Sequence, residues 1–330
     1  MKCMRLCVLF LFCFYGLMAE TPLGENFKLL SNDEIVVIDS YGGNGDFDIY
    51  EPETNSYKQS FNLPGIPFDV GSGDINSSGY DEIIGLYSNS IYVCWYNGSS
   101  WQGQSYDLGK GGMKYVACGD CIIDSISPGC EIITASNDSL FKWDWSPTGI
   151  NLVGSSYASD GVYDVCCGDI DGDRYDEIVY LTSSKSNLNL VYINEDGKSR
   201  VSPTSIIPDE KGNFVKLSAG NLREDIREEV VILETNSWPS NDEIHFFEYD
   251  LTDSSFVEIK TMSAGHRGDI DISCGNADTD RYEEVFLLRD NKTVYVNNYD
   301  NYEGSFSCLL YTSDAADDMQ CVDLGGRRII

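Results

Sequence analysis

The feature that most constrains the fold is a motif that recurs six times along the chain at nearly even spacing. Each copy ends in a glutamate, and successive glutamates lie 48, 49, 46, 52 and 55 residues apart. These residues are Glu34, Glu82, Glu131, Glu177, Glu229 and Glu284. A period of about 50 residues is typical of propellers and solenoids, in which each repeat forms one supersecondary unit. The spacing therefore predicts a series of similar units.

The residues around each motif predict β-strands. Stretches such as 68–73 and 163–168 precede the motif and end in small residues. Small side chains suit the innermost strand of a propeller blade, because the blades converge on the axis. After the motif, apolar runs such as 229–233 predict a strand that is buried on both faces. Two more strands follow, as at 244–249 and 256–259, so the sequence predicts an all-β propeller of four-stranded blades.

The best-preserved copy spaces oxygen-bearing groups in the way that suits a calcium ion. It reads Gly-Asp-Ile-Asp-Gly-Asp-Arg-Tyr-Asp-Glu-Ile-Val over residues 168–179. Counted from the first aspartate, side-chain oxygens stand at positions 1, 3, 5 and 9, and position 7 offers its carbonyl. Hard oxygen donors at this spacing can satisfy the coordination of calcium. The predicted ligands are Asp169, Asp171, Asp173, Tyr175 and Glu177.

Two further loops keep this spacing with fewer carboxylates. They predict the ligand sets Asn276, Asp278, Asp280, Tyr282 and Glu284, and Asp74, Asn76, Ser78, Tyr80 and Glu82. The second set contains two carboxylates and is expected to bind most weakly. Asp, Asn and Gly also favour turns that hold no metal. Three loops in the same register nevertheless favour about three calcium sites.

The loop at 221–229 has lost this pattern, because arginines stand where ligands would be expected. We hypothesise that a guanidinium replaces the cation there by pairing with Asp225 and Glu229. The loop at 120–131 is two residues longer than the metal loops. For that loop we hypothesise a disulfide between Cys121 and Cys130 in place of a metal.

The metal-loop pattern resembles the FG-GAP/VCBS repeat of integrin α-subunit-like propellers, and the resemblance covers residues 26–307. It implies a β-propeller, commonly seven-bladed, with calcium in the first hairpin of several blades. That family usually has glycine at position 6, where this chain has Gly79 but also Arg174 and Arg281. A positive φ there either costs more in the arginine loops, or those loops have another shape.

Both ends of the sequence carry segments that we expect to lie outside the folded domain. Basic residues precede an apolar run at 6–17, so residues 1–19 are interpreted as a signal peptide of a secreted protein. Residues 308–330 match the translation of a sequencing-library adaptor, so we expect the native chain to be truncated near Ser307. The first repeat lacks a long loop, and we expect its inner strand to come from the missing C-terminal part, in a full-length ring of seven blades.

A formal net charge of −32 argues against partners that are themselves anionic, namely nucleic acid and acidic membrane surfaces. We therefore predict a secreted, monomeric calcium-binding propeller, not inserted in a membrane, that recognises an extracellular protein or a glycan in adhesion or carbohydrate binding. The alternative is a propeller-type polysaccharide lyase or glycoside hydrolase. No catalytic residues are predicted, since His245 is expected to be structural and His266 with Arg267 is only a weak axial candidate.

Overall fold

The computed structural model of the 330-residue chain describes residues 5–8, 35–39, 46–51, 56–97, 99–121, 129–182, 187–193, 199–205, 212–223, 227–236, 240–276, 282–289, 293–298 and 307–311. Within these ranges every regular element is a β-strand, as the sequence predicts. None of the described residues belongs to a helix long and apolar enough to cross a membrane.

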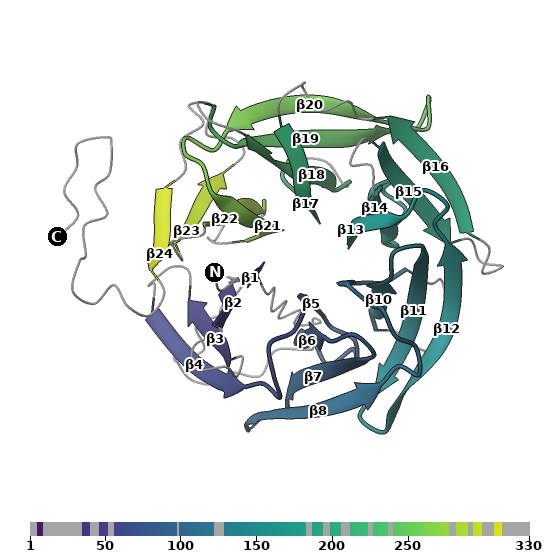
Figure 1. Ribbon diagram of the computed structural model, residues 1–330, viewed down its shortest axis with the longest axis vertical. Coiled ribbons are helices and arrows are strands. Elements are labelled where there is room, and N and C mark those ends of the chain that lie inside the picture. The colour runs from purple at the N-terminus through teal and green to yellow at the C-terminus, as the bar shows by residue number, and fades with distance from the viewer. Residues whose placement is uncertain are drawn as a thin grey trace, which may run out of the picture.

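The strands form small antiparallel sheets that stand around a central axis like the blades of a propeller (Figure 1). The described strands make six sheets of four, each built from strands consecutive in the sequence. The first three sheets contain β1 (Arg5–Val8), β2 (Ile35–Asp39), β3 (Asp46–Glu51) and β4 (Ser56–Asn62), then β5 (Asp69–Gly73), β6 (Glu82–Leu86), β7 (Ser90–Tyr96) and β8 (Trp101–Asp107), then β9 (Tyr115–Gly119), β10 (Glu131–Ala135), β11 (Ser139–Ser146) and β12 (Gly149–Tyr157). The other three contain β13 (Val162–Gly168), β14 (Glu177–Thr182), β15 (Asn187–Ile193) and β16 (Ser199–Ser205), then β17 (Gly212–Gly220), β18 (Glu229–Asn236), β19 (Glu243–Asp250) and β20 (Ser255–Ser263), then β21 (Asp269–Gly275), β22 (Glu284–Arg289), β23 (Thr293–Asn298) and β24 (Ser307–Tyr311).

The motif glutamates mark the same register in five of these sheets. Each begins the second strand and pairs with the glycine that ends the innermost strand. The pairs are Gly73–Glu82, Gly119–Glu131, Gly168–Glu177, Gly220–Glu229 and Gly275–Glu284. The metal loops predicted from the sequence therefore all lie in the first hairpin of their sheet.

Close approach of the innermost strands explains why those glycines are needed. A Cβ added to Gly119 would lie 2.5 Å from the Cβ of Cys167 in the next sheet. A Cβ added to Gly73 would lie 2.8 Å from that of Cys118. Real Cβ atoms do not pack this closely, so the convergence on the axis selects small residues here.

The hydrophobic core lies between neighbouring sheets. Strands β6, β10 and β14 are buried along their whole length, as near-continuous hydrophobicity predicts. Val179 and Leu181 of one sheet, for example, share a buried cluster with Val230, Ile232 and Phe247 of the next. Burial of these side chains holds each sheet against its neighbours.

A repeated backbone hydrogen bond also joins the first hairpin of one sheet to that of the next. The amide donor precedes the motif glutamate, and the acceptor is the carbonyl that opens the preceding loop. These bonds are Cys130 N to Asp74 O at 3.0 Å, and Asp176 N to Asp120 O, Glu228 N to Asp169 O and Glu283 N to Asn221 O, each at 2.9 Å. Neighbouring loops are thus tied together around the ring.

The first and last strands fall in segments that the sequence assigned to the chain ends. Strand β1 lies within the predicted signal peptide and pairs with β2. It also contacts β5 and β21, so it fills the inner position that we expected a C-terminal strand to occupy. Strand β24 lies largely within the predicted adaptor segment and pairs with β23. The remainder of residues 1–19 and 308–330 lies outside the described residues, and the signal-peptide, adaptor and seven-blade predictions stay predictions.

We predict that Gly119→Ala destabilises the protein by about 1–3 kcal/mol, because the added methyl group overpacks the contact with Cys167. The midpoint of urea unfolding measures this change. Gly111→Ala is the control, since a Cβ there would meet nothing within 4 Å. Equal stability of the two variants would contradict this account of the inner strands.

Candidate metal centre

The loop between β13 and β14 gathers three of its predicted ligands into one cluster. Asp169, Asp171 and Glu177 each present a carboxylate oxygen, and these three oxygens all lie within 4.8 Å of one another. Glu177 is buried, and the two aspartates are half-buried. Three carboxylates at this separation can close around one cation with small movements of their side chains.

Backbone amides of the same loop hold the carboxylates in place. Asp169 accepts hydrogen bonds from Gly172 N (2.8 Å) and Arg174 N (3.0 Å). The Oε2 atom of Glu177 accepts from Ile170 N (3.0 Å) and from Asp171 N (3.2 Å). The loop therefore wraps its backbone around two of its own acids, which leaves the acids pointing inward together.

The electrostatics of the cluster favour a bound cation. Burial, and then repulsion by Asp171, raises the pKa of Glu177 to about 8. Burial also raises the pKa of Asp169 and of Asp171. Crowding disfavours the charged forms, and a divalent ion would remove that repulsion.

The other two predicted ligands of this loop, Asp173 and Tyr175, are not part of the three-carboxylate cluster. Asp173 is exposed and does not belong to the cluster, and its Oδ1 accepts a hydrogen bond from Tyr175 N at 2.9 Å. No described contact tests the carbonyl of Tyr175 as a ligand, so that role stays a prediction. The structure thus brings together three of the five predicted donors.

The backbone of Arg174 shows whether the arginine loop has the usual turn at position 6 or another shape. Arg174 has a φ of 82°, and Gly79 at the same position of its loop has a φ of 80°. The two loops therefore have the same turn, and the arginine loop bears a left-handed residue that costs about 1 kcal/mol. At position 4 the roles reverse, with Gly172 at 84° and Ser77 at 55°.

The loop between β5 and β6 repeats this geometry with weaker donors. Asp74 accepts hydrogen bonds from Ser78 N and Gly79 N, both at 2.8 Å. Glu82 accepts from Ile75 N at 3.1 Å and from Asn76 Nδ2 at 2.6 Å. Burial, and then the nearby Asp74, raises the pKa of Glu82 to about 8. The Oδ1 atom of Asn76 is buried and accepts no hydrogen bond from the described residues.

The hydroxyl of Ser78 and the backbone carbonyl of Tyr80 remain predicted ligands only. The hydroxyl of Ser78 donates to the carbonyl of Tyr80 at 3.2 Å, so both groups lie close together on the exposed side of the loop.

The third predicted loop, at 276–284, is described only in part. Asn276, Tyr282 and Glu284 are described, but Asp278 and Asp280 lie outside the described residues.

The arginine loop confirms part of the hypothesis made for it. The Nε atom of Arg223 donates to Glu229 Oε1 at 2.7 Å, and its Nη2 pairs with Glu248 at 2.7 Å. Arg223 stands at position 3, where the metal loops have Asp171 and Asn76. A guanidinium therefore neutralises the fully buried Glu229. The other predicted partner, Asp225, lies outside the described residues.

The disulfide hypothesis for the longer loop is wrong. Cys121 and Cys130 are both free thiols. The sulfur of Cys121 instead lies 3.8 Å from that of Cys167, in the next sheet. The backbone amide of Cys121 donates to Glu131 at 2.9 Å, so this loop too is anchored on its motif glutamate. Sequence spacing alone did not reveal that Cys121 faces the adjacent blade.

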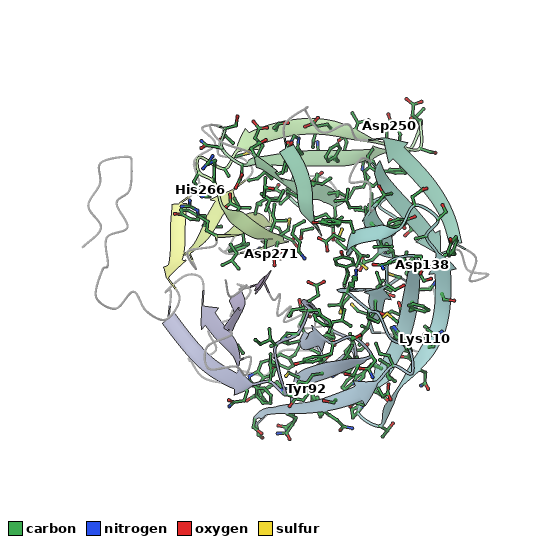
Figure 2. All side chains as sticks on the ribbon, viewed as in Figure 1. Tyr92, Lys110, Asp138, Asp250, His266 and Asp271 are labelled. Carbon is green, nitrogen blue, oxygen red and sulfur yellow. The ribbon has the colours of Figure 1, made fainter. Side chains whose placement is uncertain are left out.

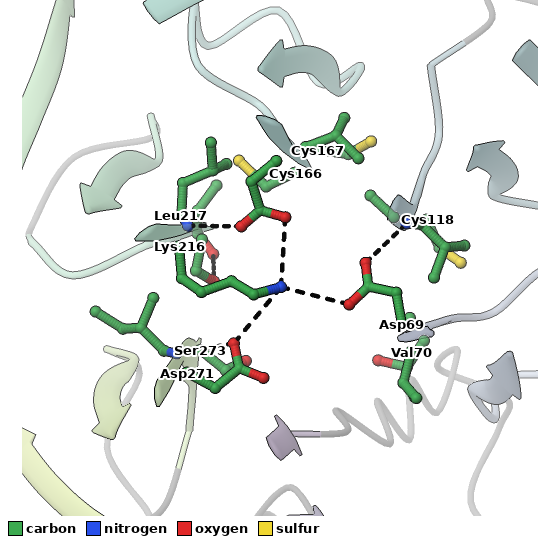
Figure 3. A pocket seen from close by; sticks show the side chains of 18 residues that line it. Asp69, Val70, Cys118, Cys166, Cys167, Lys216, Leu217, Asp271 and Ser273 are labelled. Atoms are coloured by element: carbon green, nitrogen blue, oxygen red, sulfur yellow. Dashed lines mark hydrogen bonds and ion pairs between the residues drawn. The ribbon is translucent and has the colours of Figure 1, made fainter. Parts of the chain in front are cut away.

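A second feature, not predicted from the sequence, is a cavity of about 180 Å³ on the axis. The ammonium of Lys216 lies among three carboxylates there, 3.4 Å from Asp69, 3.4 Å from Asp164 and 3.9 Å from Asp271 (Figure 3). These four residues come from four innermost strands, each one position before the branched aliphatic column. Burial raises the pKa of Asp164 to about 7, and Lys216 limits the rise.

The two histidines lie away from this cavity. Neither His266 nor Arg267 lines it, and Figure 2 places His266 well outside the axial position of Asp271. The idea that His266 faces the channel is therefore wrong. His245 is buried in β19 and bonded to Glu234 and Glu258, in keeping with a structural role.

We predict that the metal-free protein loses stability as the pH rises from about 5 to 8. Glu177 and Glu82 keep a proton in the folded state up to about pH 8, whereas the unfolded chain loses it near the ordinary carboxyl value. The stabilising proton is thus present at low pH and lost through pH 8. Melting curves in EDTA across this range should show a smaller fall for Glu177→Gln, and an unchanged fall would contradict the assignment.

Comparison of the sequence with models of known protein families finds no match, and comparison with curated proteins finds none either. The resemblance to the FG-GAP/VCBS repeat therefore rests on the loop motifs of this chain alone. It stays a prediction, while the propeller architecture stands on the described sheets.

Proposed function

We propose that this protein is a calcium-binding β-propeller of the FG-GAP/VCBS type that acts as an extracellular recognition module for a protein or a glycan. The observation that carries the proposal is the convergence of Asp169, Asp171 and Glu177 within 4.8 Å in a first-hairpin loop. Donors that are all hard oxygens favour calcium over softer metals. Secretion is supported by the leader pattern at residues 1–19.

The three proposed sites should differ in affinity. The loop at 169–177 supplies three clustered carboxylates, and calcium affinity rises with the number of charged ligands. The loop at 74–82 replaces two of its acids with Asn76 and Ser78 and should bind more weakly. The loop at 276–284 is proposed as the third site from its sequence pattern. A seven-bladed full-length ring and a monomeric state belong to the same proposal.

The proposed ion has a structural role. The carbonyl of Asp169 accepts the hydrogen bond from Glu228 N of the next sheet at 2.9 Å. An ion that fixes Asp169 therefore also stiffens the contact between two blades. The arginine loop supports this interpretation, because Arg223 places a permanent cation on the equivalent glutamate, Glu229.

The proposed recognition face is the one at which strand β5 begins. Asp69, at the start of β5, lines the cavity. Directly before it, Ile66 and Phe68 are 47% and 50% exposed although both are large and apolar. Exposed apolar side chains next to a polar cavity are common features of binding sites. Strong negative charge makes a neutral glycan or a basic protein surface the better ligand.

We predict that calcium raises the melting temperature by several degrees, because an ion at one hundred times its Kd stabilises the fold by about 2.7 kcal/mol. Asp171→Asn should reduce this shift, since it deletes one carboxylate of the cluster that is expected to bind most tightly. Differential scanning calorimetry in calcium and in EDTA measures it. Equal melting temperatures for the parent protein in both buffers would overturn the calcium proposal.

Arg223→Met provides the matched control for that experiment. It leaves Glu229 buried without its guanidinium partner, so it should lower the melting temperature equally with and without calcium. Ligand binding is tested separately, by screening glycans and extracellular proteins against the parent protein and Phe68→Ser. A ligand that binds both equally would place recognition elsewhere on the molecule.

A glycoside hydrolase is the second candidate, and the axial cavity is the observation that favours it. Asp164 is almost fully buried, and its raised pKa of about 7 suits a general acid at neutral pH. Lys216 and two further aspartates would position the substrate. A lyase for acidic polysaccharide is disfavoured, because these carboxylates would repel its substrate.

We predict for this alternative that Asp164→Asn abolishes turnover of a neutral oligosaccharide, because an amide cannot donate the proton. Reducing-sugar release measures the activity. Asp160→Asn is the control, since Asp160 is exposed and does not line the cavity. If the parent protein cleaves no glycan in the screen, the hydrolase is ruled out and the recognition module is retained.

A further inference from the structure

A cluster of one histidine and several glutamates lies on the fifth sheet, apart from the calcium loops. Glu234 of β18 pairs directly with Glu243 of β19, and His245 lies two residues further along β19. Side chains alternate along a strand, so these three residues share one face of the sheet. Their ligand atoms all lie within 4.8 Å of one another.

The charges of this cluster are incompletely balanced. Two glutamates directly opposite each other in a sheet repel and destabilise the pair unless a cation lies between them. Glu258 adds a third carboxylate, 2.7 Å from His245 Nδ1. Even a protonated imidazole would balance only one of these three charges. A divalent ion bound to the neutral imidazole would instead balance two of them.

Glu234 gives an independent indication of a ligand. Its side chain is fully buried, with an exposure of 0%. Its Oε2 atom lies 2.7 Å from His245 Nε2, but its Oε1 atom accepts no hydrogen bond from the described residues. A buried carboxylate oxygen without a donor carries a large desolvation cost. An ion bound at this oxygen would remove that cost.

The arrangement of His245 suits a metal ligand. Two atoms that bind one zinc ion lie about 3.3 Å apart, because bonds of about 2.0–2.1 Å meet at roughly tetrahedral angles. His245 Nε2 lies 2.7 Å from Glu234 Oε2, at hydrogen-bond distance, so the two side chains would move apart by roughly 0.6 Å to admit the ion between them. On the other side of the ring, Nδ1 is held by Glu258. A carboxylate in this place orients the imidazole of many metal-ligating histidines.

We propose that Glu234, Glu243 and His245 form a site for a divalent first-row transition metal such as zinc, distinct from the calcium loops. Imidazole with carboxylates favours zinc, whereas calcium takes oxygen ligands almost exclusively. Glu243 is only half-buried, so its side chain can move the small distance needed to close on the ion. Water would complete the coordination. The proposed hairpin sites offer only oxygen donors and prefer calcium, whereas this site adds a nitrogen donor and prefers zinc. The two sites can therefore be titrated separately.

The test is calorimetric titration of zinc into the full chain kept in saturating calcium, so that the hairpin loops are occupied. One equivalent of zinc should bind. His245→Gln and Glu243→Gln should each weaken binding by more than about 100-fold, since losing even an outer partner of a ligating histidine costs 10–100-fold. Among the described residues Glu243 forms no side-chain hydrogen bond or ion pair, so its variant should fold even if His245→Gln does not.

His266→Gln is the matched control, because it changes the only other histidine of the chain and should leave zinc affinity unchanged. Cobalt serves as a spectroscopic probe, since a thiolate ligand would add a strong charge-transfer absorption that this site should lack. Absence of zinc binding, binding that survives Glu243→Gln, or a thiolate signal from the cysteines would each overturn the proposal. The calcium melting shift depends on Asp171 and stays unaffected by these variants, so failure of one proposal leaves the other standing.

Discussion

A hydrogen bond from a loop amide to a buried motif glutamate recurs in four of the described sheets, and the rest of each blade is arranged around it. The donors are Ile75, Cys121, Ile170 and Leu222, and the acceptors are Glu82, Glu131, Glu177 and Glu229. The bond fixes where the second strand begins, opposite the glycine that ends the first. The bond occurs in loops with and without the metal pattern, so the anchoring role of the glutamate does not depend on a bound ion.

Each anchor brings a carboxylate charge into the interior, and the blades compensate that charge differently. Glu229 meets a guanidinium from Arg223. Glu177 stands among Asp169 and Asp171, which increases the negative charge and makes an external cation the natural complement. The same requirement returns at Glu234, where His245 supplies part of the compensation.

Much of the fold follows from sequence because one constraint repeats. Small residues at the inner column, such as Gly119 and Cys167, and apolar second strands reflect the same geometry in every blade. The axial cluster escaped notice because its column holds different residue types, Asp164 and Lys216 among them, and only the ring brings them together. The disulfide prediction failed for a related reason, since Cys121 meets Cys167 across a blade boundary. Contacts between repeats leave no spacing signal within one repeat.

The direction of the innermost strands gives the disc two unlike sides. Strand β5, for example, begins at Asp69, beside Lys216, and ends at the hairpin glycine Gly73, so these two residues are separated by about 13 Å along the backbone. A partner seated at the mouth of the channel would leave the hairpins open to solvent on the reverse side. The proposed calcium loops and the proposed recognition face thus lie at opposite ends of β5, so ion binding and partner binding would not compete for space.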